Sequence, residues 1–270
     1  MKKIAAVIID TYAGKRMPRH ALEQALKIPN LNSVYTFSTS PIMEGENFFR
    51  IRPIESLEHY SDIVLNVLPN VILEDFALVV QWDGVAHNPN SWSDDFLDFD
   101  YIGAPWSDEP ESRAVGNGGF SLRSQRQLAA TKRIPIQRHA GLEKYDAEDV
   151  VLCRYYRSML ECFGVKFAPP DIARRFAYET GPITTHLGFH GSHNFPFFLS
   201  EAYLSECAGE IVERCSNNVM LAVVLINAQR RGYMELCLAL SDKIMRDETL
   251  RQEIANILVG AKISIPNFTS

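Results

Sequence analysis

The sequence lacks several features that would assign it quickly to a class. It has no Cys-x-x-Cys pair, and its five cysteines have no close spacing, which is a poor framework for disulfides or a zinc site. It has no run of basic residues, and its net charge is −6, which argues against a nucleic-acid partner. No apolar stretch approaches the roughly 18 residues of a membrane span, and the first one is too short for a signal peptide. We therefore expect a cytoplasmic protein without a membrane span.

The size and apolar content suit one large domain with a small addition. The 270 residues are 46% apolar and 22% charged, enough for an α/β domain of about 200 residues and an appendage. Buried strands are predicted by apolar, β-branched runs at 4–9, 34–37, 76–80 and, more briefly, 48–52. Amphipathic spacing predicts helices at 20–26, 55–68 and 147–163. Strands that alternate with helices predict an α/β fold with a mostly parallel sheet flanked by helices.

The character of the chain changes near residue 199. Residues 200–262 are rich in Leu, Ala and Glu, and their spacing predicts about three amphipathic helices. We therefore expect an α/β domain at 1–198 and an all-helical appendage at 199–270. The appendage could form a homodimer, dock another partner or pack on the domain before it. The segments 85–146 and 164–198 are expected to be mainly loops, and long loops in a compact domain are often functional.

Ligands of open parallel sheets bind at the carboxyl ends of the strands. The sequence after the first strand contains Thr11 and Tyr12, and the strand at 76–80 is followed by Trp82 and Asp83. A carboxylate there suits Mg²⁺ or Mn²⁺, which prefer oxygen ligands and take the remainder from phosphate and water. An Asp before a Gly is also common in simple turns.

A glycine-rich segment at 116–121 has three glycines within four positions. Such a segment lets the backbone approach a sugar or pyrophosphate closely, although a plain turn has the same composition. It matches neither the dinucleotide-binding fingerprint nor a Walker A loop. The aromatic segment 98–106 could line an acceptor or base pocket, or could be a packed loop.

Two further segments carry ionisable side chains. Glu148 and Asp149 open a predicted helix, where carboxylates either cap the helix or act as a general base. Three histidines occur within the eight residues 186–193, which suggests a metal or phosphate contact without indicating zinc.

The order of these segments resembles the layout of GT-A glycosyltransferases: an acidic DxD-type motif after a strand, a glycine-rich loop, an xED motif and a C-terminal histidine. Here they correspond to Gln81-Trp82-Asp83, residues 116–121, Ala147-Glu148-Asp149 and His190. The blocks QWDG, DYIGAPW, GNGGFSLRS and LGFHG look like a bacterial family of glycosyltransferases, with similarity over about residues 1–195. The resemblance implies a GT-A-like, Rossmann-related domain.

The resemblance also implies roles for individual residues. Asp149 would be the catalytic base, with Glu148 as the alternative. Asp83 and His190 would hold a divalent ion, Mn²⁺ or Mg²⁺; because Gln81 replaces the first acid of DxD, metal dependence rests on this pair alone. Donor binding is expected from Thr11, Tyr12, Lys15, Trp82, Asp83, Gly118 and Gly119, and the acceptor side from Trp106, Asn117, Phe120 and Ser121.

The function implied is transfer of a hexose from a nucleotide-sugar donor, with a UDP-sugar favoured, to a hydroxyl acceptor on a glycan, lipid-linked or other molecule. Synthesis of bacterial surface polysaccharide or glycoconjugate, with inversion at the anomeric carbon, fits best. The alternatives are a non-catalytic nucleotide-sugar or carbohydrate-binding module, and a nucleotidyltransferase-like phosphate-handling enzyme. The sequence identifies neither the donor sugar nor the acceptor.

Overall fold

A computed structural model describes residues 2–134, 147–215 and 218–260. The chain forms two compact units, Met1–His190 and Gly191–Ser270. The second unit begins before the boundary expected at 199, because helix α8 (Phe195–Phe198) packs against α11 (Asn218–Arg230) of the helical region.

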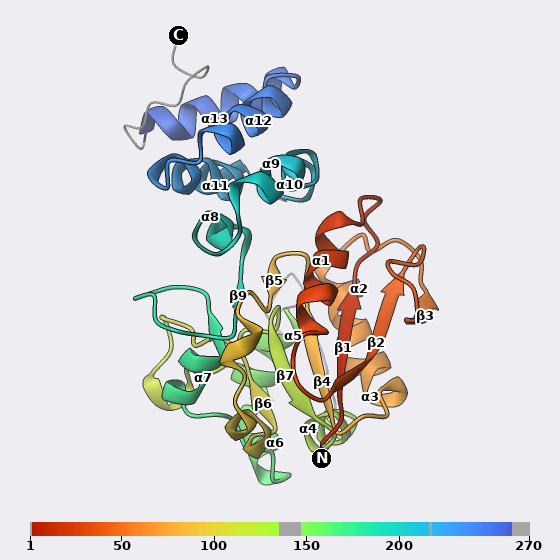
Figure 1. The fold of residues 1–270 in the computed structure, drawn as a ribbon. Helices are drawn as coiled ribbons and strands as arrows, with labels where there is room; N and C mark the ends of the chain where they lie inside the picture. The colour runs from red at the N-terminus through yellow and green to blue at the C-terminus, as the bar shows by residue number, and fades with distance from the viewer. Residues whose placement is uncertain (1, 135–146, 216–217, 261–270) are drawn as a thin grey trace. The chain divides into compact units, whose positions relative to one another are not determined.

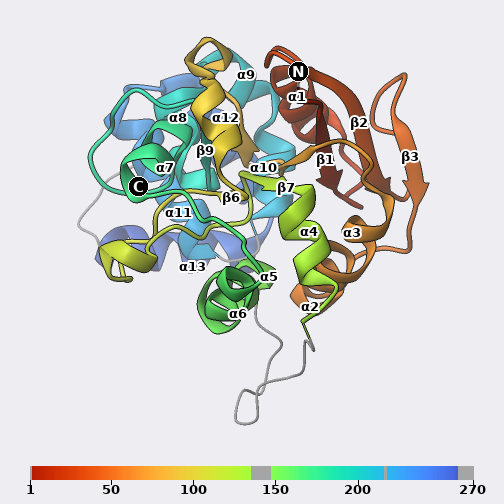
Figure 2. The ribbon, with the colours of Figure 1, turned by 90° about the horizontal axis from the view of Figure 1, so that it is seen from below.

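The centre of the first unit is a six-stranded, mostly parallel sheet with the order β3-β2-β1-β4-β7-β6 (Figures 1 and 2). The strands β1 to β4 are mutually parallel, whereas β7 runs antiparallel to both of its neighbours, β4 and β6. Its strands are β1 (Ile4–Ile9), β2 (Leu31–Ser38), β3 (Asn47–Arg50), β4 (Phe76–Val80), β6 (Tyr101–Ile102) and β7 (Ser121–Ser124).

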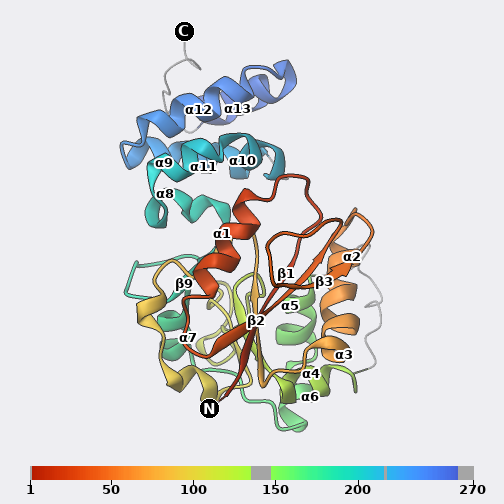
Figure 3. The ribbon, with the colours of Figure 1, turned by 45° about the vertical axis from the view of Figure 1, so that its right-hand side comes forward.

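Helices cover both faces of this sheet, and β1 and β4 are therefore buried along their whole length. On one face, Val7 and Val79 pack with Ile63, Val64 and other apolar side chains of the segment that joins α2 to α3. Helix α1 lies on the opposite face (Figure 3). The helices of this unit are α1 (Arg16–Ala25), α2 (Leu57–Asp62), α3 (Leu68–Val71), α4 (Gln125–Thr131), α5 (Glu148–Val150), α6 (Arg157–Cys162) and α7 (Pro170–Phe176), with π-helical turns at Ile63–Val67 and Val151–Tyr155.

A second, three-stranded sheet with the order β5-β9-β8 lies in the part of the unit expected to be loop. Its strands are β5 (Gly84–Val85), β8 (Ala177–Tyr178) and β9 (Gly188–His190). The antiparallel pairing of β5 with β9 sets Gly84 opposite His190. Two sequence segments that are about a hundred residues apart therefore meet here.

The second unit is helical. Beside α8 and α11 it contains α9 (Glu201–Glu206), α10 (Ala208–Arg214), α12 (Met234–Ile244) and α13 (Glu248–Gly260). Ser200 begins α9 by accepting a hydrogen bond from the backbone N–H of Tyr203, as a serine N-cap does. No helix in the described part of the chain has the length and apolarity for a membrane crossing.

The predicted fold class, α/β with a mostly parallel sheet followed by a helical region, is confirmed. The segment 85–146 is rich in loops in its described part, as expected, and it also contains the short elements β6, β7 and α4. One local prediction was wrong: the described part of 200–262 contains five helices, α9 to α13, where about three were expected.

Candidate functional site

The topology brings the chemistry-bearing segments to one edge of the sheet. Strands β1 and β4 are parallel neighbours, with Ile8 paired to Val80, so the segments that follow them leave the sheet side by side. Because β7 is antiparallel to β4, its first residue, Ser121, pairs with Val79 near the end of β4. The glycine-rich segment before β7 therefore enters the sheet at the same edge.

Gly118 and Gly119 lie close to three other segments, which contain Gly84, Asp149 and His190. The N–H of Gly118 donates to Asp149 Oδ2 at 2.7 Å. A Cβ atom at Gly119 would lie 2.1 Å from Nε2 of His190, and one at Gly84 would lie 2.1 Å from the carbonyl oxygen of Gly119. These distances leave no room for side chains, so glycine is required for the segments to approach each other.

The two carboxylates of the acidic pair have different environments. Glu148 is buried and accepts two hydrogen bonds from the Arg123 guanidinium, at 2.7 and 2.9 Å. Burial opposes the charge on Arg123, but Glu148 raises the pKa of the guanidinium above its ordinary value. Asp149 instead accepts hydrogen bonds from the backbone N–H groups of Gly118 and Val150. The Arg123 guanidinium therefore binds the first carboxylate of the pair, and backbone groups orient the second.

His190 lies between three other functional groups. Its Nε2 atom is 3.9 Å from Asp83 Oδ1 and 3.2 Å from Gln81 Oε1, and Gln81 in turn donates to the Tyr60 hydroxyl at 2.7 Å. Its Nδ1 atom is 3.3 Å from Glu179 Oε1. Burial alone would lower the pKa of His190, but the hydrogen bond to Glu179 and the nearby carboxylates of Asp83, Glu179 and Asp149 raise it to about 9.

Asp83 Oδ1 and His190 Nε2 are 3.9 Å apart. Adjacent ligands held about 2.1 Å from an octahedral ion lie about 3.0 Å from each other, so the two side chains would have to move closer together to hold one ion. Among the residues that the structure describes, no group of three or more His, Cys, Asp or Glu could hold a metal.

The predicted donor residues after β1 form a separate group. Lys15 donates to Ser38 Oγ at 2.8 Å and to the Asp10 carbonyl oxygen at 3.3 Å. The backbone N–H of Tyr12 donates to Asp10 Oδ1 at 3.0 Å, and Thr11 accepts from the backbone N–H of Ile54. Trp82, like these residues, is partly exposed at the carboxyl edge.

The residues predicted on the acceptor side have different positions. Trp106 is partly exposed, packs on Gly116 and carries Arg154 over its ring at 4.4 Å. Phe120 is fully buried and stacks on Phe176, and Ser121 is buried with its hydroxyl on the Gly118 carbonyl oxygen. Phe120 and Ser121 therefore support the glycine segment from inside the protein.

Asn117 links the glycine segment to a carboxylate that the sequence did not single out. Its Nδ2 atom donates to Glu179 Oε2 at 2.8 Å and lies 3.0 Å from His190 Nδ1. Asn117 is 4% exposed, and its Oδ1 atom has no hydrogen-bond partner among the described residues. Glu179 follows strand β8, and the pairing of β8 with β9 brings it to His190. The residues around Glu179 in the sequence therefore did not indicate that it belongs to this group.

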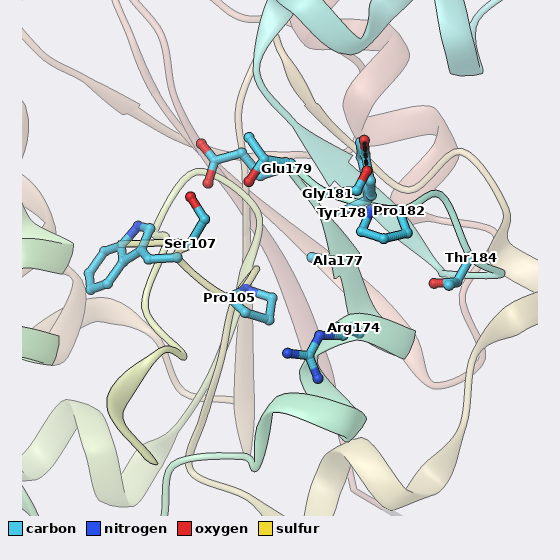
Figure 4. Close-up of a pocket in the computed structure, with 11 residues that line it drawn as sticks. Pro105, Ser107, Arg174, Ala177, Tyr178, Glu179, Gly181, Pro182 and Thr184 are labelled. Atoms are coloured by element: carbon cyan, nitrogen blue, oxygen red, sulfur yellow. Dashed lines mark hydrogen bonds between the residues drawn. The ribbon is translucent and has the colours of Figure 1, made fainter. Parts of the chain in front are cut away.

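A pocket of about 200 Å³ lies beside Glu179 (Figure 4). In the view of Figure 4, Pro105 and Ser107 lie to one side of Tyr178, Gly181 and Pro182. The remaining lining residues are Trp106, Arg174, Ala177, Glu179, Thr180 and Thr184.

A family model described as a protein of unknown function (DUF5672) matches residues 46–194, more than half of the chain. The chain belongs to the DUF5672 family. The matched part contains Asp83, Asn117, Asp149, Glu179 and His190, while the Thr11–Lys15 group lies before it. No curated protein sequence matches the chain.

Solved structures show distant similarity to this DUF5672 protein. A glycosyltransferase involved in glycosylation of the major capsid of PBCV-1 aligns at 14% identity and a TM-score of 0.47, over 70% of this chain and 93% of that one. The apo-form glycosyltransferase GlyE of Streptococcus pneumoniae aligns at 12% and 0.41, over 70% and 54%. A mannosyltransferase from Pyrobaculum calidifontis, in complex with GDP-Man and Mn²⁺, aligns at 8% and 0.44, over 97% and 80%. At these values the similarities carry no conclusion about activity.

Proposed function

We propose that this DUF5672 protein is a glycosyltransferase that uses a nucleotide-sugar donor and a hydroxyl acceptor. One observation carries the proposal: Asp83, His190 and Asp149 converge around Gly118 and Gly119 at the carboxyl edge of the sheet. Such a transfer needs a backbone that a donor can approach closely, polar groups for its diphosphate and a separate carboxylate. Gly118 and Gly119, the pair Asp83 and His190, and Asp149 are proposed for these three roles.

Asp149 is proposed as the general base that removes the proton from the acceptor hydroxyl. Its carboxylate is oriented by two backbone N–H groups, which leaves lone pairs for the acceptor. Glu148 is proposed as a positioning residue, because both of its oxygens are occupied by Arg123. A base that activates the acceptor for direct displacement inverts the anomeric carbon, so inversion is the proposed outcome.

Asp83 and His190 are proposed to hold the diphosphate end of the donor with a divalent ion, Mn²⁺ or Mg²⁺. Such an ion, when bound, would offset the negative charge on the departing nucleoside diphosphate. Gln81 Oε1 faces His190 Nε2, and Gln81 Nε2 donates to the Tyr60 hydroxyl, so His190 would have to release the proton on Nε2 in order to bind the ion. Lys15 and Tyr12 are proposed for the nucleoside part, because they lie at the end of the neighbouring strand.

A thermal-shift screen tests the proposal. Purified protein is heated with UDP-, GDP-, dTDP- and CMP-sugars, each with Mn²⁺, Mg²⁺ or EDTA. A donor at 100 times its Kd adds roughly 2.7 kcal/mol, which raises the Tm of a chain of this size by roughly 5–10 °C. We expect one nucleotide class to give this shift, and Asp83→Asn to lose it. Asp95→Asn, a variant of an exposed residue, is the matched control and should keep it.

The outcomes separate the proposal from its rivals. A shift that survives EDTA removes the metal and keeps the transferase. A shift without release of nucleoside diphosphate supports a nucleotide-sugar-binding module instead. Release of pyrophosphate from a nucleoside triphosphate supports a nucleotidyltransferase, and no shift with any donor overturns the proposed donor class.

A further inference from the structure

We propose that the pocket beside Glu179 binds one neutral sugar ring of the acceptor. The assignment of this sugar to the acceptor rests on the proposed transferase function. The saccharide site itself is argued from the pocket alone. Two chain segments form its walls. One contains Pro105, Trp106 and Ser107, and the other runs from Ala177 to Thr184 after β8 (Figure 4).

The size of the pocket matches a small ligand. Its volume of about 200 Å³ is below the roughly 300–1,000 Å³ of pockets for drug-sized ligands. A single pyranose ring is smaller than such ligands, and further rings of a glycan could extend into solvent. The diphosphate and base of a donor are proposed instead at the edge that contains Asp83 and Lys15.

The lining has the chemistry of a sugar site. Tyr178 provides aromatic surface for the C–H face of a ring, and it is fixed by a 2.8 Å hydrogen bond to the Gly181 carbonyl oxygen. Ser107, Thr180 and Thr184 provide hydroxyl groups for hydrogen bonds. Such a combination of apolar walls and a few polar groups is typical of small-molecule sites.

The charges in the pocket favour a neutral ligand. Two lining residues are charged, Arg174 and Glu179, and they lie toward opposite ends of the view in Figure 4. Arg174 binds both oxygens of Glu111, at 2.9 and 3.1 Å. Glu179 faces His190 and Asn117. Because each charge has a partner of its own, an acidic or basic sugar gains little over a neutral one.

A chain of contacts joins the pocket to the proposed base. Glu179 binds Asn117, which precedes Gly118, and the N–H of Gly118 binds Asp149. Two hydrogen bonds and one peptide bond therefore connect a residue of the pocket to the proposed base. The donor diphosphate is proposed at Asp83 and His190, so the pocket is assigned to the acceptor.

Ligand-observed saturation-transfer NMR tests the site. The probes are the methyl glycosides of glucose, galactose, mannose and N-acetylglucosamine. We expect at least one to give a signal with the wild type and to lose it in Thr180→Trp and in Ser107→Trp, which fill the pocket from opposite walls. Both positions are exposed, so the fold should be kept, and the Tm of each variant checks this. Thr185→Trp, exposed in the same loop and outside the pocket, should keep the signal.

The outcomes also separate this inference from the proposed function. No signal from any probe, or a signal that persists in both filling variants, overturns the site even if a donor shifts the Tm. A signal lost in both variants while no donor binds supports the saccharide site and removes the transferase. Displacement of the glycoside by the nucleotide-sugar, but not by the nucleoside diphosphate, overturns the acceptor assignment in favour of the donor sugar.

Discussion

The backbone N–H of Gly118 donates a hydrogen bond of 2.7 Å to the carboxylate of Asp149. This bond joins two segments that are 31 positions apart and fixes the carboxylate against the glycine segment. A side chain held by backbone donors keeps its orientation. Asp149 therefore has a fixed position beside the glycine segment, which the proposed general base requires.

Asp149→Asn is expected to lower the rate of nucleoside diphosphate release from the donor by about 10²–10⁴-fold, the usual contribution of a general base. The amide oxygen of Asn can still accept the hydrogen bond from Gly118, but its NH2 group then faces the N–H of Val150 and that bond is lost. Loss of one hydrogen bond costs about 1 kcal/mol, so the Tm should fall by roughly 2–4 °C. Release is measured with the donor that the thermal-shift screen identifies. Asp95→Asn should behave as the wild type, and an undiminished rate in Asp149→Asn would show that another group is the base.

Glu148→Gln is expected to act on stability. The change leaves the buried Arg123 guanidinium without its carboxylate, and breaking a buried ion pair costs about 3–5 kcal/mol. Urea denaturation of the wild type and the variant measures the free energy of unfolding. Asp95→Asn, which breaks an exposed pair with Arg175, should cost less than about 1 kcal/mol. A double variant, Arg123→Met with Glu148→Leu, should recover much of the stability; equal losses in single and double variants would contradict the role of the ion pair.

Gly119→Ala should disturb the site through a single methyl group. The added Cβ would lie 2.1 Å from the His190 ring and 2.8 Å from Gln81 Oε1, so the ring must move. Overpacking of this kind costs about 1–3 kcal/mol, and we expect loss of the donor-induced Tm shift as well. Gly209→Ala, where the nearest atom is 3.9 Å away in helix α10, is the control. Unchanged donor binding in Gly119→Ala would show that the His190 position does not matter for the donor.

His87 predicts a loss of stability in acid. Burial lowers the pKa of His87 to about 4, and the neighbouring His186 acts in the same direction. The unfolded chain takes up this proton near pH 6.5, so the free energy of unfolding falls as the pH is lowered from 6.5 toward 4. His87→Phe should flatten this part of the stability profile and leave the difference from wild type constant above pH 7. Identical slopes for both proteins between pH 6.5 and 4 would contradict the lowered pKa.

The sequence was sufficient for the buried strands and for the position of Asp83 after the end of a strand. β1 and β4 are uninterrupted apolar runs, and such runs have few other placements in a soluble domain. The prediction that Asp83 follows a strand end rested on this alone. The roles of the individual site residues remain predictions.

Other parts depend on contacts between distant segments. β7 was missed because Ser121, Arg123 and Ser124 are polar yet buried, and Arg123 is tolerated inside only because Glu148 lies opposite. Glu179 reaches His190 through the pairing of two short strands. The residues next to Arg123 in the sequence do not indicate Glu148, and those next to Glu179 do not indicate His190. The spacing of residues along the chain therefore could not predict these two contacts.

The packing at Gly118 and Gly119 has a consequence for how such a protein can diversify. The contacts that assemble the centre are made by the main chain, and no side chain can be added there without collision. The loop at 180–185, in contrast, is exposed along its length. If the proposed saccharide site is correct, exchange of this loop should change which sugar binds, while Gly118 and Gly119 keep the residues around them in place. Engineering for a new acceptor should therefore change residues 180–185 and leave the two glycines as they are.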